Sequence, residues 1–231
     1  MFSKLRQLFT SESLLDEAFN TTLVMLEFDQ EMYRASTISL RETDVALPDI
    51  DVRKTDVKVN KYEREVRRMV LTHLSVSGTQ HLVPGLVLIS IVIDVERIGD
   101  YTKNISDLAG QHASKLKGGD YEAKLREIEQ FVTDNFEKTI TVLKSHDKET
   151  AREVMSVEQV VGKASDWIVN EMIANRNSAI PAGDAVSLAL YARYLKRINA
   201  HLTNIASAVV NPFPRIGFSD KKSGDASGSE E

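Results

Sequence analysis

Apolar residues recur every three or four positions along most of this chain, the spacing of helices that bury one face. The pattern predicts six long helices, over residues 14–41, 51–74, 82–112, 121–144, 148–174 and 182–210. The breaks between them contain Pro48, Gly78, Gly118 and Pro181, residues that end helices and form turns. No stretch shows the alternation of a strand, so the sequence predicts an all-α fold.

The third predicted helix changes character halfway along. Residues 82–93 carry no charge and are almost wholly apolar, and then Glu96, Arg97, Asp100 and Lys103 follow in close succession. Glu96 and Asp100 are one helical turn apart and share a face. The apolar run is too short to cross a bilayer, so it predicts a buried core helix that ends in aligned carboxylates.

The sixth predicted helix repeats the third at an offset of 100 residues, without a gap. The identical residues of the third helix are Leu88, Arg97, Ile98, Asn104 and Ile105, which meet Leu188, Arg197, Ile198, Asn204 and Ile205. Such a repeat predicts a duplicated unit, with one antiparallel three-helix bundle over residues 11–117 and a second over 120–210. The two carboxylates are not repeated, because Lys196 stands opposite Glu96 and Ala200 opposite Asp100.

Two flanking segments have their own composition. Residues 1–10 combine four large apolar side chains with Lys4 and Arg6, a pattern that fits either a short helix on a membrane surface or a first turn docked on the bundle. Docking is favoured, because ten residues bury little area. Residues 211–231 are polar and rich in Ser, Gly and charge, so we expect a disordered tail.

The overall composition excludes several classes of function. A net charge of −5 disfavours nucleic-acid binding, and the lack of cysteine excludes disulfides and thiolate chemistry. The first twenty residues become charged before the hydrophobic region of a signal peptide could form, so we expect no signal peptide.

Other candidate chemistry is sparse. None of the five histidines follows a glutamate at the spacing of ferritin-like metal sites, and neither a phosphate-binding loop nor a nucleophile elbow occurs. His201 is interpreted as a surface or capped histidine and Trp167 as a core residue. The basic residues Arg64, Arg67 and Arg68 are interpreted as a solvated face paired with neighbouring glutamates.

The two related motifs, VERIGDYTKNI at 95–105 and YLKRINAHLTNI at 194–205, stand in register within a duplicated three-helix unit. This arrangement resembles the PhoU family of phosphate-transport accessory proteins. The resemblance implies a cytoplasmic regulatory adaptor, not an enzyme, that restrains phosphate uptake and phosphate-starvation signalling. The implied partners are a phosphate transporter, either the ATPase subunit of an ABC importer or an ion-coupled carrier, a sensor histidine kinase and a second copy of the chain. Peripheral contact with a membrane is compatible with this role.

The resemblance also implies a metal site of the Glu-x-x-x-Asp type. Matched residue by residue, Glu96 and Asp100 are the ligands, and Asp56 of the second predicted helix joins them, with Asn60 one turn further on. The carboxylates suit hard ions such as iron, manganese or magnesium. The second copy has lost this pattern, so no equivalent site is expected there.

Two alternatives remain open from the residues themselves. Arg97 and Lys103 could supply the positive charge that the carboxylates require, which would make this an ion-paired helix face in a metal-free scaffold. A carboxylate-ligated metalloenzyme, an oxidase or hydrolase, would need further ligands that the sequence does not offer at the expected spacing.

Overall fold

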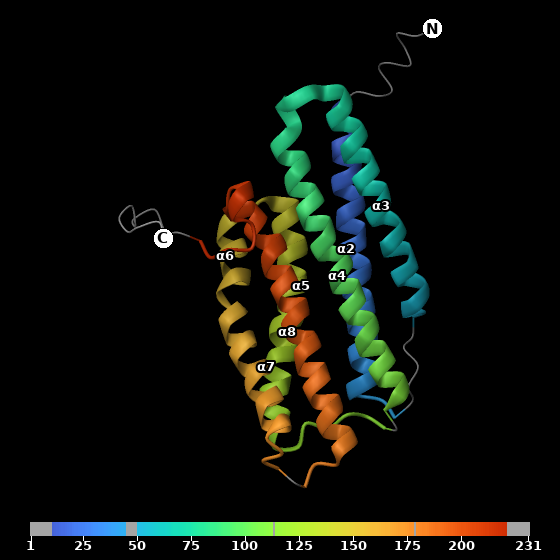
Figure 1. Cartoon of the computed structure of the whole chain (residues 1–231), viewed down its shortest axis with the longest axis vertical. Coiled ribbons are helices and arrows are strands. Elements are labelled where there is room, and N and C mark those ends of the chain that lie inside the picture. The colour runs from blue at the N-terminus through green and yellow to red at the C-terminus, as the bar shows by residue number, and fades with distance from the viewer. Residues whose placement is uncertain (1–10, 45–49, 113, 178, 221–231) are drawn as a thin grey trace, which may run out of the picture.

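The computed structural model describes residues 11–44, 50–112, 114–177 and 179–220, and within them every extended element is a helix. The first repeat consists of α2 (Ser11–Arg41), α3 (Val52–Ser77) and α4 (Leu82–Gln111). The second consists of α5 (Glu122–Ser145), α6 (Lys148–Ser156), α7 (Glu158–Ile173) and α8 (Ala182–Val210). The two antiparallel bundles lie side by side (Figure 1), which confirms the predicted all-α double bundle.

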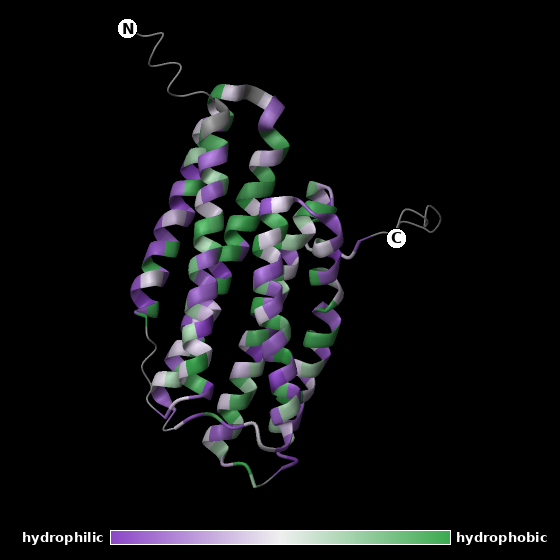
Figure 2. Cartoon of the chain, turned by 180° about the vertical axis from the view of Figure 1, so that it is seen from behind, coloured by the Kyte–Doolittle hydropathy of each residue, from purple (hydrophilic) through white to green (hydrophobic). Residues whose placement is uncertain are grey.

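Helix α4 is central to the first repeat, because it packs against both α2 and α3 and also against α8 of the second repeat. Its uncharged half supplies core side chains, among them Leu88, Ile91 and Val92. Figure 2 shows hydrophobic and hydrophilic residues interspersed along every helix, as expected where one face of each helix is buried. The apolar half of α4 therefore contributes to the buried core, as its composition predicted.

The two repeats share one continuous core. Helix α4 lies against α8 and α2 lies against α5, and most of the buried apolar residues of both bundles form one cluster, beside a small second cluster of Val142, Ala151, Val154 and Ala206. A buried ion pair reinforces this contact: Arg41 Nε at the end of α2 lies 2.7 Å from Glu129 Oε1 of α5. Arg41 also pairs with Glu122 at 2.6 Å and donates a hydrogen bond to the Leu116 carbonyl, while Tyr191 Oη of α8 donates to Glu129 at 3.0 Å. The contact between the repeats thus combines apolar packing with buried ion pairs.

The fifth predicted helix is interrupted, which the apolar spacing did not indicate. Helix α6 ends at Ser156 and α7 begins at Glu158, with Val157 between them at ψ −6°. The Ser156 hydroxyl donates a 2.7 Å hydrogen bond to the Glu153 carbonyl, a local bond that competes with the helical ladder and bends helices. The assignment of Trp167 to the core was also wrong: the side chain is 44 % exposed and its ring packs beside Tyr121 at 5.2 Å.

The helices of the first repeat extend further than predicted at one end. Helix α3 continues to Ser77, and a single 3-10 turn, η1 (Gly78–His81), leads directly into α4. The prediction of disorder for 211–231 was wrong for its first part, since η3 (Phe213–Arg215) forms and Asn211 donates hydrogen bonds to the carbonyls of Arg215 and Phe218. The predicted amphipathic segment 1–10 and residues 221–231 lie outside the described residues. No helix in the described ranges is long and apolar enough to cross a membrane.

Candidate functional site

An acidic cluster lies where α3 faces the charged half of α4, and all three predicted ligands belong to it. Asp56 comes from α3 and is almost fully buried, whereas Glu96 and Asp100 come from successive turns of α4 and are part-buried. Asn60, one turn after Asp56, donates a 3.3 Å hydrogen bond to the Asp56 carboxylate. The helices thus bring together residues that are about forty positions apart in the sequence.

The ammonium of Lys103 stands between two of these carboxylates. Its Nζ atom lies 3.0 Å from Asp56 Oδ2 and 2.8 Å from Asp100 Oδ1. Burial acts to lower the pKa of Lys103, but the hydrogen bonds to Asp100 and Asp56 outweigh it and hold the pKa above its usual value. Lys103 is therefore charged and joins α4 to α3 through a bridged pair of carboxylates.

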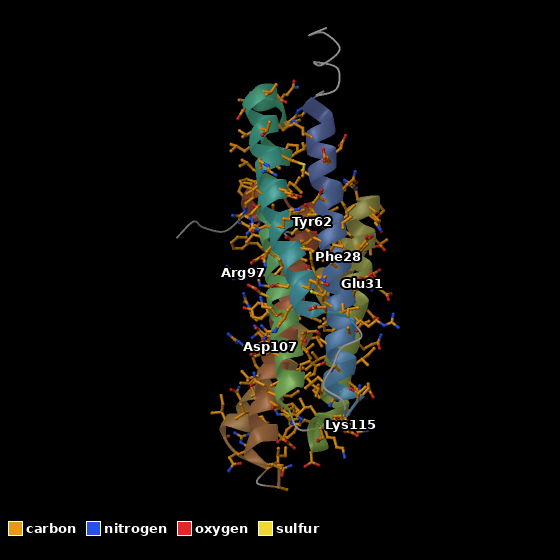
Figure 3. All side chains as sticks on the ribbon, turned by 90° about the vertical axis from the view of Figure 1, so that its right-hand side faces the viewer. Phe28, Glu31, Tyr62, Arg97, Asp107 and Lys115 are labelled. Carbon is orange, nitrogen blue, oxygen red and sulfur yellow. The ribbon has the colours of Figure 1, made fainter. Side chains whose placement is uncertain are left out.

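Glu96 is more loosely held than its neighbours. The nearest cation is Arg97, whose Nε lies 3.7 Å from Glu96 and whose Nη1 lies 3.5 Å from Asp100. Arg97 is more than half exposed and projects outward at the edge of the first repeat (Figure 3). Burial, and then the charge of Asp100, raise the pKa of Glu96 despite the opposing effect of Arg97. The cluster is thus short of positive charge on the Glu96 side.

A fourth carboxylate, Asp29 of α2, lies beneath the cluster and was not predicted from the sequence. Its side chain is 0 % exposed, and neither carboxylate oxygen has a hydrogen-bond partner. Burial raises the pKa of Asp29 well above its usual value, and the charges of Asp56, Glu96 and Asp100 raise it further. A signal for it exists in the sequence, because Asp29 occupies the apolar stripe of its helix, three residues after Leu26 and four before Tyr33.

The donor chemistry of this cluster fits a hard cation. Four carboxylates lie close together on three helices, with the ammonium of Lys103 between two of them, and neither of the buried Asp29 oxygens has a hydrogen-bond partner. As arranged here, however, no three His, Asp or Glu groups in the described ranges surround one point closely enough to hold an ion. The cation that occupies the gap between Asp56 and Asp100 is Lys103.

The corresponding place in the second repeat carries a different charge pattern. Lys196, which aligns with Glu96, forms an ion pair with Asp166 of α7, with Nζ at 2.7 Å and 2.6 Å from the two carboxylate oxygens. Ala200 and Gly162 line the same surface and offer no side-chain oxygen. Two lysines, Lys163 and Lys196, and two acids, Glu158 and Asp166, thus share this surface, where the first repeat collects four acids.

His201 lies in the contact between the repeats; of the two predicted alternatives, a surface or a capped histidine, the surface one was wrong. The side chain is buried, and its Nδ1 lies 2.7 Å from Asp94 Oδ1 on α4. Asn204 donates to the same oxygen at 3.1 Å, and the His201 ring stacks on Tyr101 with centroids 5.8 Å apart. Helix α4 therefore presents Asp94 and Tyr101 to α8 and presents Glu96, Asp100 and Lys103 toward α3.

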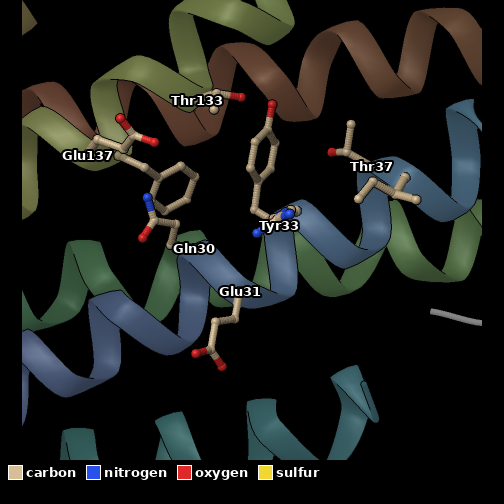
Figure 4. A pocket seen from close by; sticks show the side chains of 9 residues that line it. Gln30, Glu31, Tyr33, Thr37, Thr133 and Glu137 are labelled. Carbon is tan, nitrogen blue, oxygen red and sulfur yellow. The ribbon is translucent and has the colours of Figure 1, made fainter. Parts of the chain in front are cut away.

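A separate cavity of about 410 Å³ lies between α2 and α5 (Figure 4). Its lining mixes Tyr33 and Phe136 with polar and charged side chains such as Thr37, Thr133 and Glu137. Tyr33 points from α2 toward the second repeat, where its hydroxyl lies 3.4 Å from the Glu129 carbonyl oxygen. This lining contains neither a nucleophile beside a base nor a set of ligands for a metal.

Comparisons with known proteins agree with the repeat. The model of the PhoU domain matches twice, over residues 22–109 and 125–209. The fold is similar to the crystal structure of PhoU from Pseudomonas aeruginosa, with a TM-score of 0.78 and 19 % identity over 87 % of this chain and 97 % of that one. It is also similar to the phosphate transport system regulatory protein PhoU from Streptococcus pneumoniae, with a TM-score of 0.74 and 15 % identity over 87 % of this chain and 95 % of that one. No curated protein matches the sequence. Because the domain model covers most of both repeats, the chain belongs to the PhoU family.

Proposed function

We propose that this protein is a regulatory adaptor of phosphate transport that works by binding rather than by turnover. The observation that carries the proposal is the double match to the PhoU domain, which spans both bundles. Two solved structures with the same fold are PhoU proteins, and one of them is described as a phosphate transport system regulatory protein. The fold supplies two long helical flanks and a rigid shared core, which suit a protein that docks on others.

The acidic cluster is the part of the surface through which such an adaptor would respond to cations. Asp56, Glu96 and Asp100 would hold a hard ion such as iron, manganese or magnesium, and the unpartnered oxygens of Asp29 lie beneath them. A bound ion would supply fixed positive charge on the α3–α4 face. Lys103 already bridges Asp56 and Asp100, so an ion must compete with this ammonium.

The geometry of Lys103 also favours a second candidate, a metal-free adaptor. In that case the ammonium is the permanent counter-charge of the cluster, and the surface that a partner meets is fixed by protein groups alone. Metal analysis of the purified protein beside Glu96→Gln/Asp100→Asn separates the two. Metal retained by the wild type and lost from the variant supports ligation, whereas equal metal content in both contradicts it.

The expected partners are a phosphate transporter, through the ATPase subunit of an ABC importer or an ion-coupled carrier, and a sensor histidine kinase. We further propose that the protein forms homodimers in the cytoplasm. The test of the adaptor role is affinity purification of the tagged full chain from phosphate-replete cells, with membrane proteins retained in detergent. Recovery of a phosphate transporter subunit is expected. Recovery of none, together with phosphate uptake that is unchanged when the gene is deleted, would refute the proposal.

A further inference from the structure

Helix α3 carries a concentration of positive charge that the rest of the chain does not share. It contains seven basic and three acidic residues. The whole chain has 29 basic and 34 acidic residues, so the part outside α3 has 22 basic and 31 acidic ones. The counterparts of α3 in the second repeat, α6 and α7, together have three basic and five acidic residues. The double bundle therefore does not require a basic helix at this place.

Five of these cations form a line along the exposed side of α3, which we call the cationic stripe. Successive members are three or four residues apart, the spacing of side chains on one side of a helix: Lys54, Lys58, Lys61, Arg64 and Arg68. All five are exposed, and at 1.5 Å per residue the stripe is about 21 Å long. Helix α3 packs against α2 and α4 and lies at the edge of the molecule in Figure 1, so no other described helix covers this side.

Most of the cationic stripe has no counter-charge within the protein. In the described ranges, Lys54, Lys58, Arg64 and Arg68 form no ion pair with a carboxylate, and Lys61 has only a loose contact with Glu65 at 3.7 Å. Arg64 and Arg68 therefore differ from the predicted pairing with neighbouring glutamates. Like charges at this spacing destabilise a helix, so an anionic group from another molecule would relieve the repulsion along α3.

The unpaired positive charge is confined to a narrow line. The other two cations of α3 are already paired, Arg53 with Asp107 and Arg67 with Glu63, each at 2.6 Å. A planar lipid surface or a nucleic-acid duplex would meet these carboxylates and the acidic remainder of the chain as well, whereas a single helix can follow the stripe alone. Val57 lies within the stripe and is 65 % exposed, so the same line offers one apolar contact.

We propose that the cationic stripe binds an acidic α-helix of a partner protein, an inference that rests on the proposed adaptor role only in that the protein acts by binding another protein. The partner helix carries carboxylates every three or four residues, so that they pair with the stripe over successive turns. A helix is the expected form, because side chains at this spacing rise by the same distance per turn as the stripe does. An apolar side chain at its centre covers Val57.

Designed peptides test the charge pattern. The probe is a labelled helical peptide with glutamates along one face and a leucine at the centre of that face. One control peptide has the same residues in an order that spreads the glutamates around the helix, and another has lysine in place of glutamate. By fluorescence anisotropy, the full chain should bind the probe about tenfold or more tightly than either control. Equal binding of the probe and the reordered peptide, or no binding of the probe, would overturn the proposal.

Two variants with the same change in net charge locate the binding surface. The first reverses four charges of the stripe, Lys54→Glu/Lys61→Glu/Arg64→Glu/Arg68→Glu. The second reverses four exposed cations outside α3, Lys117→Glu/Lys148→Glu/Lys163→Glu/Arg193→Glu. The first should lose about tenfold or more in affinity for the glutamate peptide and should gain affinity for the lysine peptide, and the second should bind as the wild type does. Equal losses in both variants would contradict the proposal.

The other anionic surfaces are measured with the same proteins. Phosphatidylglycerol vesicles and a DNA duplex should bind the wild type more weakly than the glutamate peptide does. Tighter binding of either one, lost when the stripe is reversed, would overturn the assignment to a protein helix. Circular dichroism confirms that each variant is folded.

Photo-crosslinking in cells tests the stripe with its charges intact. A photoactivatable residue replaces Val57 or, as the control, Val186 of α8, whose side chains are 65 % and 59 % exposed. Mass spectrometry should place the adduct of position 57 in an acidic helix of a partner and find no such adduct at 186. No adduct at 57, or one in a segment without an excess of acids, would overturn the proposal.

The result is separable from the test of the adaptor role. If affinity purification recovers a phosphate transporter subunit while position 57 gives no adduct, the stripe is not the binding surface and the adaptor role stands. An adduct at 57 in an acidic helix of a protein unrelated to phosphate transport would support the stripe and contradict the proposed role.

Discussion

Gly99 of α4 lies directly against Asp29 of α2: a Cβ atom built on Gly99 would be 2.9 Å from Asp29 Oδ1, closer than real side chains approach. The glycine therefore allows a fully buried carboxylate to lie beneath the acidic cluster. The arrangement of the acidic cluster therefore depends on the glycine at position 99 as well as on the acidic residues that form it.

This relationship predicts energetic coupling between the two positions. Gly99→Ala should destabilise the wild type by about 1 kcal/mol, because the fully buried Asp29 carboxylate would have to shift to make room for the new methyl group. The same change in an Asp29→Ala background should instead stabilise the helix by about 0.5–1 kcal/mol, the usual gain from replacing glycine. Urea unfolding of the four proteins gives the coupling energy. Additive effects would show that the two residues do not interact.

Asp29 should make the stability of the protein fall as the pH rises. The folded chain holds the Asp29 proton more tightly than the unfolded chain, since burial raises the pKa above its usual 3.8. Its contribution to stability is complete below about pH 3.8 and is lost as the pH rises through the raised folded pKa. In chelator-treated protein, Asp29→Asn should therefore be more stable than the wild type by about 1–3 kcal/mol at pH 7, with a smaller difference at pH 4. Denaturant unfolding at both pH values measures this, and a difference that does not change with pH would contradict it.

Removing the ammonium of Lys103 should expose the cation affinity of the cluster. Lys103→Met leaves Asp56 and Asp100 without the group that bridges them, so the metal-free protein should be less stable than the wild type. The same variant should bind Mn²⁺ about tenfold or more tightly, because the ion no longer competes with a fixed positive charge. Isothermal titration gives the affinities.

The matched control for this experiment is Lys103→Met combined with Glu96→Gln/Asp100→Asn, which removes two of the carboxylates. It should bind Mn²⁺ no better than the wild type does. If Lys103→Met binds no more tightly than the wild type, the acidic cluster does not bind Mn²⁺ by competition with Lys103.

The buried ion pair between the repeats should be costly to break on one side only. Arg41→Met leaves Glu129 buried with its main partner gone and should cost about 3 kcal/mol, since Arg126 at 3.2 Å compensates only in part. Adding Glu129→Leu should recover much of that loss. Arg67→Ala, which breaks an exposed pair with Glu63, should change stability by less than about 1 kcal/mol. Thermal and urea unfolding measure the stability of all three variants. An Arg41→Met protein as stable as the wild type would show that the buried ion pair does not contribute to stability.

The architecture could be predicted from the sequence because the apolar stripes of the helices and the repeat in α4 and α8 are both visible along the chain. The break at Val157 could not, since it leaves the apolar spacing intact. The assignment of Trp167 to the core was wrong for a related reason. Trp167 follows the apolar spacing of its helix, but its ring packs on Tyr121 and the side chain stays partly exposed.

The acidic cluster was only partly predictable. Glu96 and Asp100 are visible as neighbours on one helix, but the approach of Asp56 and Asp29 depends on how three helices pack. Lys103 was recognised as a possible counter-charge, and only the structure shows its ammonium between Asp56 and Asp100. The burial of His201 could not be predicted, because its partner, Asp94, lies 107 positions away in the sequence.

Helix α4 carries the acidic cluster on one side and the Asp94–His201 contact on the other, within two turns of each other. A rotation of this helix about its axis cannot move one set of side chains without moving the other. Any displacement of α4 that altered the acidic cluster would therefore also alter the contact of this helix with the second repeat.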